Sequence, residues 1–202
     1  MFTTDTPSGH RSRARRRIAL AAAVATTAAG VTGVGIAQAP SSTAATSCAT
    51  VYWGSLTKSS SSMTTHPLTG VRAGKHACFD RLVLDLGRKG TRSAGYNVSY
   101  VSTVRAPGSG MSVPVRGGAA LKVTVNAPMY DAQGRATYRP ANSRALVNVS
   151  GYSAFRQVAL AGSYEGRTTI ALGVRARLPM RVFVLHNADG GQRLLIDVQH
   201  SW

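Results

Sequence analysis

Acidic residues and cysteines are scarce in this chain. Its 202 residues include 7 Asp and Glu against 24 Lys and Arg, a formal charge of +17, and only 2 cysteines. So few carboxylates give no direction to a search for a paired-carboxylate glycosidase. The histidines after residue 39 show none of the HxxxH, HxH or HxxE spacings of a zinc hydrolase, and no GxSxG nucleophile elbow occurs. We therefore expect a protein that is not an enzyme and that carries no metal or other cofactor.

The first 39 residues have the layout of a secretory signal peptide. Five arginines between positions 11 and 17 precede an uncharged stretch, Ile18 to Ile36, and the small-residue triplet Ala37-Gln38-Ala39. A charged segment, an apolar segment and an A-x-A triplet are the parts of a cleavable export signal. An uncleaved anchor is the alternative, but a stretch made mostly of Ala, Gly and Thr is too weakly apolar for a stable one. We predict a signal peptide over residues 1–39, no membrane anchor after cleavage, and a secreted, cell-wall-associated protein.

The remaining chain is strongly basic. Without residues 1–39 it keeps 19 basic and 6 acidic residues, a formal charge of +13, and arginine outnumbers lysine 15 to 4. Such a charge is an argument about partners rather than about fold. Nucleic acid would be the first candidate in a cytosolic protein, but export argues against it. For an exported protein the polyanions are cell-wall phosphate polymers and anionic lipid head groups, which suit guanidinium contacts; the alternative is a basic surface with no dedicated ligand.

The two cysteines predict one disulfide. Cys48 and Cys78 both follow the signal peptide, and an even count in an exported chain indicates a pair. The bond would close a loop of about 30 residues and stabilise the fold by about 3 kcal/mol in the chain-entropy picture. A metal site is the alternative, but no histidine or further cysteine stands at ligand spacing.

The segment around Cys48 predicts a short arm. Pro40–Ser47 is small and polar, Trp53 is too apolar to stay in solvent, and the Ser/Thr run Lys58–Thr65 is flexible by composition. We therefore expect residues 40–66 to form a tether and an N-terminal arm that the disulfide pins to the domain.

From residue 67 onward, short apolar or alternating runs are separated by clusters of Gly, Pro, Asn and Asp. Such runs predict strands, and their spacing predicts an all-β sandwich or barrel. Helical periodicity of useful length is absent here, and only Ser143–Leu146 suggests a single helical turn. The predicted strands are Leu68–Ala73, Phe79–Leu86, Tyr96–Thr103, Leu121–Val125, Leu146–Val149, Phe155–Leu160, Thr168–Val174, Met180–Leu185 and Leu194–Val198.

Two of these strands repeat one pattern. Asp80–Leu86 reads DRLVLDL and Gln192–Val198 reads QRLLIDV, so each has an arginine, three apolar residues, an aspartate and a further apolar residue. In a strand, the aspartate shares a face with the central apolar residue. Such strands near the two extremes of the domain predict two facing sheets of related construction.

Several segments resemble a known family. They are LTGVRAGKHACFDRLVLDL from Leu68, GYNVSYV from Gly95, PVRGGAALKVTV from Pro114, YEGRTTIALGVRARLPMRVFVL from Tyr164 and RLLIDV from Arg193. In order and spacing they look like the actinobacterial AMIN-like domain. The resemblance implies two related β-sheets packed as a sandwich, in a type of domain that directs cell-wall amidases and secretion-pore proteins to peptidoglycan. It supplies no residue roles, and nothing here resembles the amidase catalytic module. We predict a two-sheet AMIN-like β-sandwich over residues 67–202.

The candidate contact residues are basic and fall into two groups. One surrounds the predicted turn at Leu178-Pro179, and the other lies beside the predicted disulfide. The alternative for both is a solvated polar face that protects an edge strand. Three aromatic residues, Tyr152, Phe155 and Tyr164, suggest a sugar-binding platform, with core packing as the alternative. The basic candidates are Arg72, Lys75, Arg167, Arg175, Arg177 and Arg181.

Together these observations predict a secreted, non-catalytic domain that binds the cell envelope. The expected ligand is peptidoglycan or an anionic wall polymer, contacted through the basic residues. Two alternatives remain open: a protein-interaction module that serves a secreted enzyme or an envelope complex, and an unrecognised secreted hydrolase.

Overall fold

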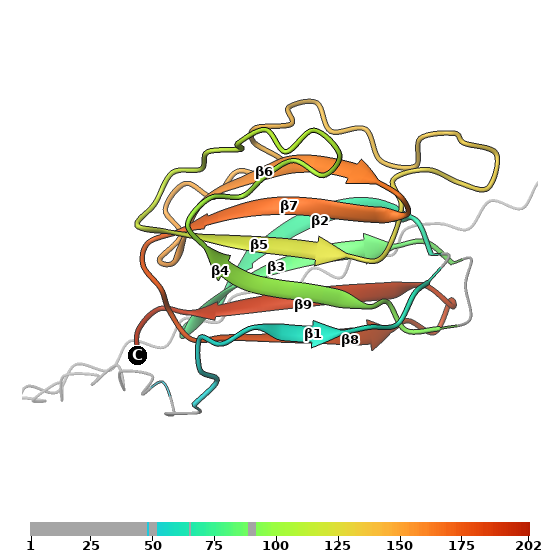
Figure 1. Cartoon of the computed structure of the whole chain (residues 1–202). Helices are drawn as coiled ribbons and strands as arrows, with labels where there is room; N and C mark the ends of the chain where they lie inside the picture. Colours follow the sequence, from blue (N-terminus) through green and yellow to red (C-terminus); the bar gives the residue numbers. More distant parts are fainter. Residues whose placement is uncertain (1–47, 49–51, 65, 89–91) are drawn as a thin grey trace, which may run out of the picture. The chain divides into compact units, whose positions relative to one another are not determined.

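Two antiparallel sheets form the molecule (Figure 1). The structure is a computed structural model that describes residues 48, 52–64, 66–88 and 92–202. The predicted all-β, two-sheet architecture is confirmed. The predicted signal peptide, residues 1–39, and the polar tether, residues 40–47, lie outside the described residues. Within the described part of the chain, no helix is long and apolar enough to cross a membrane.

One sheet has five strands and the other has four. The five-stranded sheet has the order β1-β4-β5-β7-β6, and the four-stranded sheet has the order β2-β3-β9-β8. The strands are β1 (Lys58–Ser60), β2 (Leu68–Lys75), β3 (Phe79–Leu86), β4 (Tyr96–Val101), β5 (Ala119–Val125), β6 (Phe155–Tyr164), β7 (Arg167–Val174), β8 (Met180–His186) and β9 (Gln192–Gln199).

The core lies between the sheets, where the alternating residues of the strands meet. Leu82 and Leu84 of β3 and Leu121 and Val123 of β5 are fully buried in one apolar cluster. Full burial of such side chains contributes about 1.5–3 kcal/mol each. The residues that alternate with these leucines on β3, such as Arg81 and Val83, therefore point to the outer face of the four-stranded sheet.

The predicted strands from β2 to β9 are present, but Leu146–Val149 does not form one. Leu146 N–H donates to the Val158 carbonyl of β6 (2.8 Å), and Leu160 N–H of β6 donates to the Ser143 carbonyl just before this segment (2.7 Å). Beside it, the Asn142 and Asn148 side chains accept hydrogen bonds from the N–H groups of Arg144 and Ser150. Such local bonds compete with a strand ladder. At Ser143–Leu146, where a helical turn was predicted, the chain makes a tight turn that begins at Asn142.

The two strands with the repeated pattern lie side by side in one sheet, so the prediction that they belong to facing sheets is wrong. β3 and β9 pair antiparallel, with Arg81 opposite Asp197 and Asp85 opposite Arg193. The reason is electrostatic as well as geometric. Reversing one copy of an Arg-x-x-x-Asp pattern places each arginine opposite the other strand's aspartate, and opposite charges in register stabilise a sheet.

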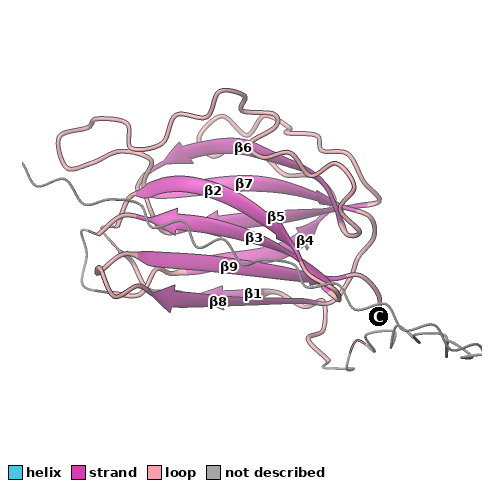
Figure 2. Cartoon of the chain, turned by 180° about the vertical axis from the view of Figure 1, so that it is seen from behind, coloured by secondary structure: helices cyan, strands magenta, loops and turns pink. Residues whose placement is uncertain are grey.

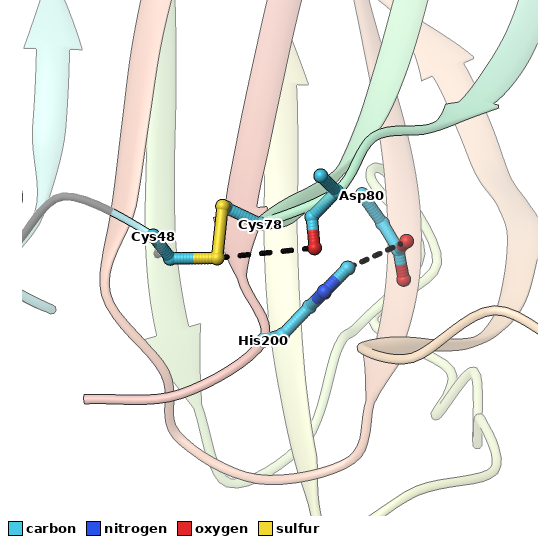
Figure 3. The surroundings of a disulfide bond; sticks show 5 residues. Cys48, Cys78, Asp80 and His200 are labelled. Atoms are coloured by element: carbon cyan, nitrogen blue, oxygen red, sulfur yellow. Dashed lines mark hydrogen bonds and ion pairs between the residues drawn. A yellow bond between two sulfur atoms is a disulfide. The ribbon is translucent and has the colours of Figure 1, made fainter. Parts of the chain in front are cut away.

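The N-terminal arm is pinned as predicted. Cys48 and Cys78 form a disulfide with a Cα–Cα distance of 5.4 Å (Figure 3). The Gly54 carbonyl accepts a hydrogen bond from Met180 N–H (2.8 Å), and Lys58 Nζ donates one to the Trp53 carbonyl (2.8 Å). The prediction of a flexible serine run is wrong for Lys58–Ser60, because these residues extend the five-stranded sheet as β1 beside β4.

A buried carboxylate ties the two sheets together beside the disulfide. Asp80 of β3 is fully buried, and its Oδ2 accepts hydrogen bonds from the N–H groups of Ala154 (2.6 Å) and Phe155 (3.0 Å) at the start of β6. Its Oδ1 lies 3.0 Å from His200 Nε2 (Figure 3). One side chain therefore satisfies backbone donors of the opposite sheet and holds the C-terminal segment.

Candidate functional site

Three charged side chains meet on the outer face of the four-stranded sheet, which Figure 2 shows in front. Arg81 of β3 and Arg181 of β8 both stand opposite Asp197 of the central strand β9. Arg81 donates from Nε to Asp197 Oδ1 (2.6 Å) and from Nη2 to Oδ2 (2.8 Å), and Arg181 donates from Nε to Oδ2 (2.8 Å). We call Arg81, Asp197 and Arg181 the Arg–Asp–Arg cluster.

The Arg–Asp–Arg cluster keeps a positive charge near the surface. The Asp197 side chain is 0% exposed, whereas those of Arg81 and Arg181 are 22% and 41% exposed. Hydrogen bonds to Asp197 raise the pKa of the Arg81 guanidinium above its ordinary value. Each guanidinium has five N–H groups, so most of their donors are not used by Asp197. One carboxylate neutralises only one of the two cations.

Aromatic rings hold the two guanidinium groups. The Arg181 guanidinium carbon lies 4.3 Å from the centre of the Trp53 ring and 5.2 Å from that of Phe183. The Arg81 guanidinium carbon lies 5.2 Å from the Phe79 ring. Cation–π contacts at such distances contribute about 0.5–1 kcal/mol each at partly exposed sites. The result is a rigid cationic and aromatic surface, which can donate hydrogen bonds to a carboxylate or phosphate and stack on a sugar ring.

Arg72 lies on the same face of the sheet, but it is paired. Its Nε and Nη2 donate to the two oxygens of Asp85 at 2.6 and 2.7 Å. Arg193 stands opposite Asp85 in the sheet, and among the described residues its buried Nε has no hydrogen-bond partner. The outer face therefore carries alternating arginines and aspartates from neighbouring strands.

Three other predicted candidates lie together at one end of the sandwich, on the left in Figure 1. Arg175 and Arg177 are in the connection between β7 and β8, and Lys75 ends β2. Arg175 donates from Nη2 to the His200 carbonyl, and Arg177 donates from Nε to Ser55 Oγ (3.1 Å). We call Lys75, Arg175 and Arg177 the cationic end. Arg167 lies at the start of β7, at the opposite end, so the six candidates do not form one site.

Tyr100 positions the loop that carries Arg177. Its hydroxyl accepts a hydrogen bond from Leu178 N–H and donates one to the Leu178 carbonyl, both at 2.8 Å. The Arg177 guanidinium carbon lies 5.4 Å from the Tyr100 ring centre. Burial raises the pKa of the Tyr100 phenol above its ordinary value, so the hydroxyl stays protonated and can donate at neutral pH.

The substitution Tyr100→Phe is expected to loosen this loop. It leaves the Leu178 N–H and carbonyl without the hydroxyl, and we expect the free energy of unfolding to fall by about 1–2 kcal/mol. Urea denaturation of both proteins measures this change. A control is Tyr164→Phe, since the Tyr164 side chain is half exposed at the opposite end. An equal effect of both substitutions would contradict the role assigned to Tyr100.

The predicted aromatic platform is not assembled. Tyr152 and Phe155 stack with ring centres 5.9 Å apart, but Phe155 is fully buried in the core. Tyr164 lies at the far end of β6. Tyr152 instead lines a cleft of about 510 Å³ with Arg116 and Asn148. The Nζ atom of Lys75, a residue of the cationic end, lies 6.0 Å from the centre of the Tyr152 ring.

Among the residues of the Arg–Asp–Arg cluster and the rings around it, only Arg181 was a sequence candidate. The repeated Arg-x-x-x-Asp pattern was the available signal, since two antiparallel copies pair arginine with aspartate. Trp53 and Phe183 carried no comparable signal. In the described part of the chain, no three His, Cys, Asp or Glu side chains come together as metal ligands would.

Comparison with known proteins identifies the family. The AMIN-like domain family matches residues 66–200, well over half of the chain and including β2 to β9. No curated protein and no solved structure matches the chain. The matched region begins and ends close to the predicted limits of residues 67–202. On this match, and on the two-sheet fold, the chain belongs to the AMIN-like domain family.

Proposed function

We propose that this protein is an exported, non-catalytic domain that binds the cell envelope, with peptidoglycan or an anionic wall polymer as the ligand. Membership of the AMIN-like family supports an envelope-binding role. The observation that carries the proposal is the Arg–Asp–Arg cluster, in which two guanidinium groups and the rings of Trp53, Phe79 and Phe183 share one surface.

The chemistry of the cluster suits this class of ligand. Wall polymers present carboxylates or phosphates on sugars, and planar guanidinium groups bind both through paired hydrogen bonds. Preorganisation adds to the affinity, because Asp197 and the flanking rings fix the arginine side chains before the ligand arrives. Rigid aromatic rings next to the cations supply faces on which a sugar can stack.

Co-sedimentation with purified sacculi tests the proposal. The protein, with its disulfide intact, is mixed with sacculi that retain or lack their anionic polymers, at low and high salt. Binding to stripped sacculi would assign a glycan or peptide receptor. Binding that requires the polymers and is lost in high salt would assign an anionic polymer. Failure to sediment under every condition would overturn the proposal.

The substitution Arg181→Gln tests the cluster itself. Arg81 still holds Asp197 through two hydrogen bonds, so the buried carboxylate keeps a cationic partner. Loss of one charge-assisted contact is expected to weaken wall binding about 10-fold or more. Arg167→Gln is the matched control, since it removes the same charge from an exposed position at the opposite end. Equal affinities for the two variants would show that the cluster is not the contact.

A further inference from the structure

Three strongly exposed apolar side chains lie at the cationic end of the sandwich. Tyr52, Leu56 and Trp202 are 83%, 74% and 62% exposed. The rings of Tyr52 and Trp202 have centres 6.5 Å apart. Leu56 follows Ser55, which accepts a hydrogen bond from Arg177, and the Trp202 indole N–H donates to the Arg177 carbonyl (2.9 Å). We call Tyr52, Leu56 and Trp202 the apolar tip.

The fold holds these side chains outward. The arm that carries Tyr52 and Leu56 is fixed by the Cys48–Cys78 disulfide and by the Met180 N–H to Gly54 carbonyl bond. The segment that carries Trp202 is fixed by the bond from His200 N–H to the Cys78 carbonyl (3.0 Å). A packed scaffold therefore holds the apolar tip outward. Exposed apolar side chains that gather on the surface of a domain mark an interaction site.

The exposed carboxylates lie away from the apolar tip. Arg175 and Arg177 make hydrogen bonds with the segments that carry the apolar tip. The aspartates nearest this end, Asp80 and Asp197, are fully buried. At the opposite end, the turns and loops carry Asp131, Glu165 and Asp189. Among the described strands and loops, no exposed Asp or Glu side chain lies at this end, so the side-chain charge beside the apolar tip is positive.

We propose that the apolar tip and the cationic end dock this protein on an anionic lipid surface. Tryptophan and tyrosine favour the boundary between head groups and acyl chains, where their rings are buried and their polar groups stay hydrated. Lysine and arginine beside them attract anionic head groups. The exposed Leu56 favours a lipid surface over a wall polymer as the ligand, because a hydrated polymer offers no apolar phase for an aliphatic side chain. This surface adjoins the Arg–Asp–Arg cluster, because Trp53 lies between Tyr52 and Leu56 in the arm, but a lipid ligand goes beyond the proposed wall binding.

Vesicle co-sedimentation tests the proposal without any wall material, so its outcome is separate from that of the sacculus experiment. The protein is mixed with vesicles of phosphatidylcholine alone, or of equal parts phosphatidylcholine and phosphatidylglycerol. We expect binding to the anionic vesicles only, together with a blue shift of tryptophan fluorescence that Trp202→Phe removes. Absence of binding to the anionic vesicles would overturn the proposal.

The variant Tyr52→Ser/Leu56→Ser/Trp202→Ser is expected to bind the anionic vesicles at least about 10-fold more weakly, because it removes the apolar contact and keeps every charge. The matched control is Met111→Ser/Tyr130→Ser/Tyr164→Ser, which removes exposed apolar side chains elsewhere and should bind as the unmodified protein does. Circular dichroism checks that both variants are folded. Undiminished vesicle binding by the tip variant would overturn the proposal. It would also be overturned if the unmodified protein did not bind vesicles but self-associated, and if the tip variant abolished that self-association, because a second copy would then cover the tip.

Discussion

Replacing Asp80 with alanine is expected to lower the free energy of unfolding by about 3–5 kcal/mol. The carboxylate is fully buried and accepts hydrogen bonds from two backbone N–H groups, those of Ala154 and Phe155. Without it, the two buried N–H donors lose their partner, and so does the partly exposed His200 imidazole. A buried polar group without a partner destabilises the fold by more than a hydrogen bond stabilises it. The expected fall in the free energy of unfolding is therefore larger than for the loss of an ordinary hydrogen bond.

Urea denaturation and thermal melting measure this effect. For a domain of this size, each kcal/mol shifts Tm by about 2–4 °C, so Asp80→Ala should melt roughly 10 °C lower or more. Asp80→Asn is the informative companion, because its carbonyl oxygen can take the place of Oδ2 and keep both backbone bonds. The free energy of unfolding should fall less than half as far for Asp80→Asn as for Asp80→Ala.

The control for Asp80 is Asp189→Asn. Asp189 also pairs with a basic residue, Arg88, but both side chains are exposed. Exposed ion pairs contribute little, so the stability should be nearly unchanged. If Asp80→Ala were as mild as Asp189→Asn, the link that we assign to Asp80 between the two sheets would be wrong.

Removal of the disulfide is expected to have an effect of similar size. The variant Cys48→Ser/Cys78→Ser opens a link with a sequence separation of 30 residues, and the chain-entropy relation gives a loss of about 3.5 kcal/mol. The arm also loses its covalent hold, so Trp53 should leave Arg181 for part of the time. Denaturation measures the first effect, and quenching of tryptophan fluorescence by acrylamide measures the second.

Reductant provides the control. It should destabilise the unmodified protein and leave the double variant unchanged, since the variant has no disulfide to reduce. Stability of the double variant within about 1 kcal/mol of the unmodified protein would mean that the hydrogen bonds of Gly54 and Lys58 alone hold the arm. Both proposed surfaces use residues of this arm, so we expect the variant to bind sacculi and vesicles more weakly as well.

Both proposed surfaces depend on side chains that the fold has already fixed. Arg181 is held by Asp197 and by the Trp53 ring, and Arg177 by Ser55 and the Tyr100 ring. Arginines fixed in this way lose less conformational entropy on binding than free ones. The cations that lack such support, for example Arg167, are therefore poorer candidates, although charge alone would rank them equally.

The order of the strands along the chain could be predicted because its signals are local. Alternation predicted Leu121–Val125 of β5, and the flanking turn residues predicted the limits of Phe79–Leu86. The disulfide could be predicted from an even count of cysteines in a chain that we predict to be exported. The serine run failed as a prediction because β1 depends on its partner: Lys58–Ser60 has little intrinsic strand preference and is extended by pairing with β4.

The amino-acid sequence by itself determined the two-sheet β class, the single disulfide, the basic charge and the resemblance to the AMIN-like family, since these follow from composition and from patterns within a few residues. Only the tertiary structure decided that β3 and β9 are neighbours, which brings Arg81 to Asp197 across 116 residues of sequence. It also decided that Asp80 is buried and that Arg177 makes hydrogen bonds with both segments that carry the apolar tip. Pairing and burial depend on which strands meet, and that choice minimises the free energy of the whole core rather than of any one segment.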